Sequence, residues 1–382
     1  MNGLDQWPVT YDVVDLFAGS GWGVATKWLG LKEIGLEVMP EAIRTRDLNG
    51  LETLTTTDES GKRVGVSVAD LKTQFVTGIR IHIASPPCQT FSTAGKGKGR
   101  LMLDRVLQGV NVVASGDVFR PDDGDPRTWL VLEPLRVALA SRPEFIIWEQ
   151  VPPVLPVWEA CAEVLRKAHG YSVWAGCVQA EMYGVPQTRR RALLIARRDG
   201  IPAGPPPATH SRYYNREPER LDPGVAKWVS MSEALGWPTG LVRFPRLADE
   251  KETVRIGNVL YRARDLRTTD HPAFNLTEKA RSWKRWVYRG SNTDSATRRP
   301  LDAPAPTVMF GARSNKVEWM DVEAARDRTC SGVRVTVGEA AALQTFPAEW
   351  EFGGSLTKQF LQIGNAVPPL LAYAVLKMFV ET

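Results

Sequence analysis

The chain has 382 residues, which is enough for one large domain and a smaller one. Its 43% hydrophobic and 24% charged residues are typical of a soluble globular protein, without an apolar run of membrane-spanning length or a start of the signal-peptide type. The four cysteines lie far apart and form no C-x-x-C pair. That spacing argues against a zinc site or a disulfide framework, and it favours a reducing, cytoplasmic setting.

The net charge of +5 and the pI of about 9.0 amount to a mild basic bias, which alone indicates a nucleic-acid partner only weakly. The distribution of the charge is more informative. Arg and Lys are concentrated, often beside aromatic residues, at 94–105, 187–198, 212–220, 243–267 and 279–299. Basic residues interleaved with aromatic ones favour a nucleic-acid-binding surface.

The first predicted element is a strand over 13–17 that breaks into the glycine turn 18–23, followed by a helix that ends near Leu29. Strand, glycine turn and helix in this order are typical of the opening of a nucleotide-type α/β domain. The spacing is not G-x-G-x-x-G, which argues against a dinucleotide. Glycines at such a turn let the backbone approach a ligand closely.

Two further strands are predicted over 34–38 and 64–69, and each ends near an acidic residue, Glu37 or Asp70. An acidic residue in this position is either a helix cap or a ligand for a nucleoside. Two such residues in succession after a glycine turn favour an adenosine-binding edge.

The apolar run 79–84 predicts a short buried strand that stops at Pro86 and Pro87, because proline can neither donate to a sheet nor continue a helix. Cys88 follows at the carboxyl edge of the sheet, where open α/β sheets bind their ligands. A lone cysteine is most often an inert, buried thiol. Here the prolines, the strand edge and the basic, glycine-rich segment 94–100 behind the cysteine favour a nucleophile.

Beyond Cys88 the pattern alternates between helix and strand, apart from a long basic stretch over 99–127 that reads as a loop. Helices are predicted over 129–141, 156–168, 336–345 and 366–380, and strands over 143–149, 171–178 and 190–197. This alternation predicts an α/β fold with a mostly parallel sheet.

The character of the sequence changes at Ile201. Four prolines occur by residue 207, and the chain then stays polar, basic and aromatic to about residue 300 without clean periodicity. We therefore predict a main domain formed by 1–200 plus 301–382 and a smaller, irregular domain over 201–300.

Six segments match one known family in the same order along the chain. They are Asp15–Gly21, Ser85–Gln89, Glu149–Val151, Gln187–Arg191, Val335–Pro347 and Gly364–Pro369. Over 1–200 and 301–382 the chain resembles the DNA (cytosine-5) methyltransferases, and 201–300 falls where that family has its variable target-recognition domain. The resemblance implies the Rossmann-like sheet of S-adenosylmethionine-dependent methyltransferases.

The chemistry of cytosine explains why this family needs a thiol. Carbon 5 is too weakly nucleophilic to take a methyl group directly, whereas addition of a thiolate at carbon 6 makes it reactive. We expect Cys88 to be the nucleophile and Glu149, at the tip of its apolar strand, to stabilise the charge at ring nitrogen 3. By resemblance, Arg191 holds the cytosine 2-oxygen and orients Glu149, while Arg189 contacts a backbone phosphate.

The cofactor implied by the resemblance is S-adenosyl-L-methionine, with S-adenosyl-L-homocysteine as the product. Phe17 is expected to stack on the adenine, Glu37 to take the ribose hydroxyls, Asp70 to meet the adenine amino group, and Asn365 to close the pocket. The full expected set is Asp15, Phe17, Ala18, Gly19, Gly21, Glu37, Val38, Asp70, Leu71, Pro86, Asn365 and Val367.

The implied partner is double-stranded DNA, whose target base must be flipped out of the stack before carbon 6 can be reached. The loop residues expected to contact DNA are Gln89, Ser92, Lys96 and Lys98, with Arg127 at the far end of the loop. We expect a monomer without a membrane partner and, in a restriction–modification setting, a cognate endonuclease that acts separately.

Three features depart from the family pattern. Gln150 stands where the family usually has asparagine, Trp22 stands where a glycine is common, and the catalytic loop carries an insert at about 100–124. We expect the longer amide of Gln150 to alter how the proline–cysteine loop is braced, and Trp22 to narrow the mouth of the cofactor pocket.

Two other functions are compatible with the same fold. The first is methylation of RNA, as in the transfer-RNA branch of the family, but the Cys-Phe-Thr segment typical of that branch is absent from this sequence. The second is a non-catalytic DNA-binding protein, against which the intact set of Cys88, Glu149 and Arg191 argues. The recognition sequence depends on side-chain geometry and is not readable from 201–300.

Overall fold

A computed structural model of the chain describes residues 11–87, 91, 102–122, 125–214, 216–237 and 330–380, together with short stretches between 241 and 288. The expected nucleophile and most of the expected DNA-contacting residues lie outside the described residues; these are Cys88, Gln89, Ser92, Lys96 and Lys98.

The large domain is built on a seven-stranded sheet with the order β3-β2-β1-β6-β7-β10-β8. Its strands are β1 (Val13–Leu16), β2 (Glu33–Leu36), β3 (Glu52–Thr53), β6 (Ile81–Ala84), β7 (Phe145–Gln150), β8 (Ser172–Gln179) and β10 (Arg190–Arg197). β10 alone runs antiparallel to its two neighbours. The prediction of a mostly parallel α/β sheet is therefore confirmed.

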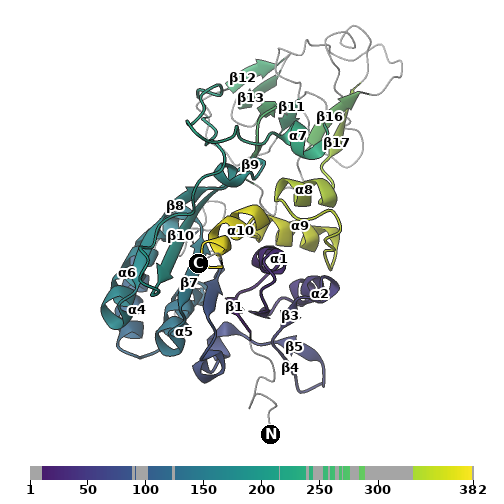
Figure 1. Ribbon diagram of the computed structural model, residues 1–382. Coiled ribbons are helices and arrows are strands. Elements are labelled where there is room, and N and C mark those ends of the chain that lie inside the picture. Colours follow the sequence, from purple (N-terminus) through teal and green to yellow (C-terminus); the bar gives the residue numbers. More distant parts are fainter. Residues whose placement is uncertain are drawn as a thin grey trace.

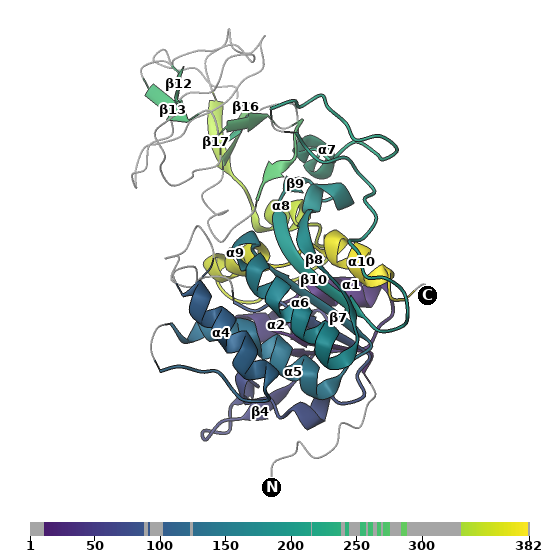
Figure 2. The same ribbon diagram turned by 90° about the vertical axis from the view of Figure 1, so that its left-hand side faces the viewer.

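Helices cover both faces of this sheet (Figures 1 and 2). One face packs against α1 (Gly21–Trp28) and α10 (Pro369–Lys377), and the other packs against α4 (Leu103–Ala114), α5 (Glu133–Ser141) and α6 (Leu155–His169). The central strand β7 serves both layers, because Phe145 and Ile147 join the first core whereas Ile146 and Trp148 join the second. Buried on both faces, β7 is apolar without alternation, which is why its sequence predicted it clearly.

The predicted strand over 64–69 is wrong beyond Gly65. β4 (Thr55–Thr57) and β5 (Arg63–Gly65) form a small hairpin, and Val68–Asp70 is a single 3₁₀ turn. Ser67 caps this turn, since its hydroxyl accepts a hydrogen bond from the Ala69 amide at 3.2 Å. Asp70 therefore ends a capped turn and not a strand.

The stretch 99–127 is not a loop throughout, because it contains the 12-residue helix α4. Val106, Val110 and Val113 are buried against the rest of the large domain at the i, i+4, i+7 spacing of one helix face. Much of the insert relative to the family pattern is thus part of the folded large domain.

A smaller four-stranded sheet, at the top of Figure 1, has the order β14-β11-β16-β17. Its strands are β11 (Leu241–Arg243), β14 (Leu266–Thr268), β16 (Lys284–Tyr288) and β17 (Cys330–Arg334). β12 (Thr253–Ile256) pairs with β13 (Val259–Arg262), and β15 (Ala273–Phe274) pairs with β9 (Gln187–Thr188). Because β17 pairs with β16, the smaller sheet extends beyond the boundary at residue 301.

The base of the smaller sheet is joined to the large domain by a third apolar core. This core gathers residues of α7 (Met231–Leu235), α8 (Val337–Leu343) and α9 (Leu356–Asn365). The indole N–H of Trp237 donates to Glu339 at 3.0 Å and ties the segment after α7 to the start of α8.

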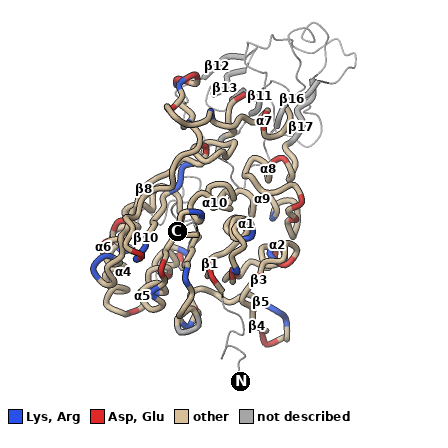
Figure 3. Tube along the Cα trace, viewed as in Figure 1, with Lys and Arg blue, Asp and Glu red and all other residues tan. Residues whose placement is uncertain are grey.

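Charged residues of both signs are interspersed along α2 (Pro40–Leu48) and the outer helices of the large domain (Figure 3). In the basic stretch 187–198, the residues Arg189, Arg191 and Arg197 are buried, at 1%, 8% and 6% exposure. Only Arg190 and Arg198 of its five arginines are exposed, so most of this stretch is not the solvent-facing basic surface that its composition suggested. Among the residues described, no helix has the length and apolar character needed to cross a membrane.

His82 on β6 gives the fold a pH dependence. Its ring is fully buried with neither nitrogen hydrogen-bonded to any residue that the structure describes, and burial lowers the pKa to about 3. Below about pH 6.5 the unfolded chain binds a proton that the folded imidazole excludes, so stability is complete above that pH and falls as pH drops toward 3. We expect a loss of about 1.4 kcal/mol per pH unit from this group.

This slope is measurable by urea denaturation of wild type and of His82→Phe between pH 7.5 and 5. The variant is expected to lose less stability than wild type over that range. Equal slopes for wild type and His82→Phe would contradict a neutral, buried imidazole.

Candidate active site

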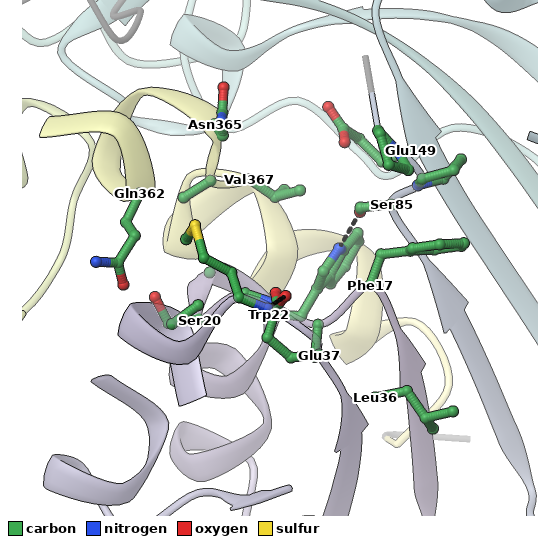
Figure 4. A pocket seen from close by; sticks show the side chains of 18 of the residues that line it. Phe17, Ser20, Trp22, Leu36, Glu37, Ser85, Glu149, Gln362, Asn365 and Val367 are labelled. Atoms are coloured by element: carbon green, nitrogen blue, oxygen red, sulfur yellow. Dashed lines mark hydrogen bonds between the residues drawn. The ribbon is translucent and has the colours of Figure 1, made fainter. Parts of the chain in front are cut away.

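One cavity of about 390 Å³ lies at the carboxyl ends of β1, β2, β6 and β7 (Figure 4). It brings together segments that are distant in the sequence. Its walls come from the glycine turn 17–22, the segments 36–42 and 66–68, Ser85–Pro87, Glu149–Val151, Arg189 and Arg191, and the C-terminal segment 362–367, with Arg127 and Leu130. This is the position at which open α/β sheets bind ligands.

The glycine turn gives the cavity its floor. Phe17 follows β1 with a φ of +63°, a conformation that is unusual for a non-glycine residue, and it lines the cavity. Gly19 also has a positive φ, of +48°. A Cβ atom at Gly21 would overlap the carbonyl of Val367, so only glycine lets α1 approach the C-terminal segment this closely.

A buried ion pair packs against the glycine turn and bonds to its backbone. Arg46 of α2 bonds to Glu33 at 2.9 Å and donates to the Gly19 carbonyl at 3.2 Å. Asp15 is fully buried, has no hydrogen-bond partner for either oxygen within the described part of the chain, and does not line the cavity. Burial, followed by the charge of Glu33, raises the pKa of Asp15 well above its usual range.

Glu37 is held in place directly after β2. Its carboxylate accepts hydrogen bonds from the backbone amides of Gly19, at 3.1 Å, and of Val38 and Met39, at 2.7 and 2.8 Å. These bonds fix a negative group at the cavity wall beside the glycine turn, where it is positioned to accept from hydroxyl donors.

The cavity wall formed by residues 66–68 contains different residues from those that the sequence predicted. Ser67 and Val68 line the cavity, whereas Asp70 and Leu71 do not. The prediction selected Asp70 at the C-terminal end of this segment, whereas its N-terminal end lines the cavity. The Ser-x-x-Asp pattern of 67–70, typical of a capped helical turn, is the signal that identifies Ser67 as the residue entering the turn.

Arginine side chains hold this wall. Glu133 of α5 binds Arg120 and Arg136 at 2.8 and 2.6 Å. Arg136 donates to the carbonyls of Val68 and Leu71 at 3.0 and 3.3 Å, and Arg120 donates to the carbonyl of Ala69. Carbonyls that a strand would pair with a neighbouring strand are thus satisfied by side chains, one of which follows the inserted helix α4.

A second ionic group faces the cavity from β7 and β10. The Arg191 guanidinium bonds to the Glu149 carboxylate at 2.8 Å, with side-chain exposures of 9% and 7%. The pairing of β7 with β10 brings the two residues to the same end of the sheet. Both line the cavity, so the two side chains expected to act together are adjacent.

Ser85–Pro87 carries the chain from β6 past the cavity toward Cys88, which lies outside the described residues. The indole N–H of Trp22 donates to the Ser85 hydroxyl at 3.0 Å, and the Gln150 amide donates to the Pro86 carbonyl at 2.5 Å. Two residues that depart from the family pattern therefore both bond to this segment.

Arg189 does not fit the expected phosphate contact. Its side chain donates to the carbonyls of Gly364 and Ala366 at 3.0 and 2.8 Å and to the side chain of Asn275 at 3.0 Å. With 1% of the residue exposed, it cannot reach a DNA phosphate without breaking these bonds. Arg189 instead joins the start of β10 to the C-terminal end of α9.

The remaining expected residues of the described part lie around the same cavity. Ala18, Val38, Pro86, Asn365 and Val367 all line it. Arg127 also lines it and is paired with Asp125 at 2.6 Å, so its charge is already partly neutralised. Gln362, which the sequence analysis did not select, lines the cavity and bonds to Thr45 of α2.

The curated relatives of this chain include several type II methyltransferases. The chain is 27% identical to the type II methyltransferase M.Eco47II of Escherichia coli, over 98% of this chain and 82% of the relative. It is 26% identical to M.HgiDI of Herpetosiphon aurantiacus, over 94% and 91% of the two chains. For M1.HphI of Haemophilus parahaemolyticus the identity is 26%, over 78% and 67%.

Solved structures share the fold at low sequence identity. The Dnmt2 methyltransferase of S. pombe superposes with a TM-score of 0.53 at 16% identity, over 97% of this chain and 98% of that one. The Entamoeba histolytica methyltransferase EhMeth gives a TM-score of 0.52 at 13% identity, over 97% and 98%. A family model described as C-5 cytosine-specific DNA methylase matches residues 11–381. Since that match spans nearly the whole chain, the protein belongs to the C-5 cytosine-specific DNA methylase family.

Proposed function

We propose that this protein transfers a methyl group from S-adenosyl-L-methionine to carbon 5 of cytosine within a specific sequence of double-stranded DNA. The observation that carries the proposal is the buried Glu149–Arg191 pair, which shares one cavity with the glycine turn and with the segment that leads to Cys88. Membership of the cytosine-specific family agrees with this choice of base.

In the proposed reaction the Cys88 thiolate adds to carbon 6 of a flipped cytosine, which places the displaced electron pair on carbon 5 and the ring. Glu149 shares a proton with ring nitrogen 3 and so stabilises that charge. Arg191, bonded to Glu149 at 2.8 Å, orients the carboxyl group. After methylation a base removes the proton of carbon 5, and the thiolate leaves carbon 6.

The residues around the glycine turn fit an adenosyl cofactor. Phe17 offers an aromatic surface, Glu37 a fixed carboxylate for the ribose hydroxyls, and the N-terminus of α1 a positive dipole end for a carboxylate. Ser67 and Val68, and not Asp70 and Leu71, form the cavity wall that would contact the cofactor. When bound, S-adenosylmethionine supplies the methyl group.

The arginine contacts at Val68–Leu71 lead to a prediction for cofactor affinity. Arg136→Met removes two hydrogen bonds to backbone carbonyls behind Ser67 and Val68, so we expect the dissociation constant for S-adenosylhomocysteine to rise about tenfold, which corresponds to about 1.4 kcal/mol. Calorimetry measures it without catalysis. Arg80→Met, which removes an exposed ion pair with Glu144, is the control. Equal affinity in wild type and Arg136→Met would contradict a supporting role for these contacts.

Sequence recognition is assigned in this proposal to the smaller domain, now taken to extend to β17. Exchanging 205–334 for the corresponding segment of a type II relative is expected to change the methylated sequence and to leave the chemistry intact. Bisulfite sequencing of DNA from expressing cells reads both properties. An unchanged motif would place recognition elsewhere in the chain.

Methyl transfer itself is tested with tritiated S-adenosylmethionine and three substrates, namely duplex DNA, single-stranded RNA and duplex DNA with 5-methylcytosine at every cytosine. The proposal predicts label in unmodified duplex DNA alone. Label in RNA but not in DNA would support the RNA alternative, and label in neither would support a non-catalytic role.

A further inference from the structure

Few backbone hydrogen bonds fix the path of the chain directly after β6. The Ser85 amide bonds to the Leu16 carbonyl at 3.1 Å, but the next two residues are prolines without an N–H group. Among the described residues, side chains form hydrogen bonds to this turn at the Ser85 hydroxyl and at the Pro86 carbonyl.

Each of these groups is bonded from a different side. β6 lies between β1 and β7 in the sheet. Trp22, on the helix that follows β1, donates to the Ser85 hydroxyl, and Gln150, at the end of β7, donates to the Pro86 carbonyl. Both donors are buried, at 1% and 3% exposure, while the Ser85 hydroxyl that accepts from Trp22 is half-buried at the cavity wall.

The bond made by Trp22 is not a routine feature of the buried tryptophans. The indole nitrogens of Trp148 and Trp158 are buried without a hydrogen-bond partner among the described residues, whereas that of Trp22 meets the serine hydroxyl at 3.0 Å (Figure 4). The Trp22 ring also packs in the core with residues of β6 and α10, which fixes the direction of its N–H group.

We propose that Trp22 is a positioning residue for the nucleophile: through the Ser85 hydroxyl, its N–H group sets the path by which the chain leaves β6 toward Cys88. The inference rests on the proposed function in taking Cys88 as the nucleophile. Trp22 thus has two distinct roles in this proposal. Its ring forms part of the cavity wall, and its N–H group binds the segment that leads to Cys88.

The test compares Trp22→Phe, which keeps an aromatic ring but lacks the N–H group, with Ser85→Ala, which removes the acceptor, and with the double variant. Trp28→Phe is the matched control, since Trp28 lies on the same helix but is 44% exposed. Adduct formation with duplex DNA containing 5-fluorocytosine is timed at saturating cofactor, and calorimetry gives the affinity for S-adenosylhomocysteine.

At saturating cofactor both single variants are expected to form the adduct about tenfold more slowly, because a misplaced reacting group lowers the rate of the chemical step. The double variant is expected to be no slower than either single one, since the two residues share one interaction. Ser85→Thr, which keeps a hydroxyl, is expected to be faster than Ser85→Ala. Additive losses, an unchanged rate, or a loss of cofactor affinity alone would overturn the positioning role.

A second measurement separates this inference from the proposed function. The alkylation rate of Cys88 by iodoacetamide, followed by mass spectrometry without DNA, is expected to change in Trp22→Phe and Ser85→Ala but not in Trp28→Phe. Absence of any adduct with wild type would contradict the proposed function. Equal alkylation rates in all four proteins would overturn the positioning role by itself.

Discussion

Cys88→Ala is expected to lower the rate of methyl transfer by at least about 10⁴-fold, because the reaction loses the group that activates carbon 5. The two thiols that the structure describes as free offer no substitute. Cys161 is buried beneath the sheet, where burial raises its thiol pKa, and Cys177 lies on β8 away from the cavity. DNA affinity, measured by gel shift, is expected to persist, since the substitution removes one sulfur atom and no charge-bearing contact.

Cys177→Ala is the matched control for this experiment. It removes a thiol of intermediate exposure from the same sheet, and we expect it to retain wild-type transfer. Measurable turnover by Cys88→Ala, or a comparable loss in Cys177→Ala, would contradict Cys88 as the nucleophile.

Glu149→Gln is expected to reduce the maximal rate by about 10²- to 10⁴-fold, the range typical of a lost proton-sharing group. The amide retains the shape of the side chain but cannot share a proton with ring nitrogen 3. It also leaves the Arg191 guanidinium, with 9% of its side chain exposed, without a carboxylate partner. Single-turnover methylation at saturating DNA and cofactor measures the effect on the chemical step.

Glu144→Gln provides the comparison for Glu149→Gln. Glu144 precedes the same strand, but it is paired with Arg80 at a side-chain exposure of 38% and does not line the cavity. We expect its substitution to leave the single-turnover rate unchanged. A Glu149→Gln protein with the wild-type rate but weaker DNA binding would make Glu149 a binding residue only.

The elements that the sequence predicted best are those whose signal is local. The apolar runs of β1, β6 and β7 are buried on both faces, and proline or a glycine turn ends them where the strands end. Because parallel strands place their carboxyl ends at one edge, Phe17, Glu37 and Glu149 could be predicted to meet there, and all three line one cavity.

The errors concern contacts between distant segments. The 66–71 segment avoids the sheet because Arg120 and Arg136 satisfy its carbonyls, a pairing that no local pattern reveals. Arg189 reads as surface charge, yet the carbonyls of Gly364 and Ala366 bury it. The helix within 99–127 was predictable in principle, since its valines repeat at helical spacing, but glycine and charge on both sides favoured a loop.

The most direct measurement concerns the covalent bond between sulfur and cytosine. Wild-type protein is mixed with S-adenosylmethionine and duplex DNA bearing 5-fluorocytosine, whose fluorine cannot leave as a proton does, and the product is digested and sequenced by mass spectrometry. We predict a denaturation-stable adduct on the peptide that contains Cys88, and none with Cys88→Ala. Failure of wild type to form an adduct on its methylated sequence, or attachment at another residue, would contradict the proposed reaction.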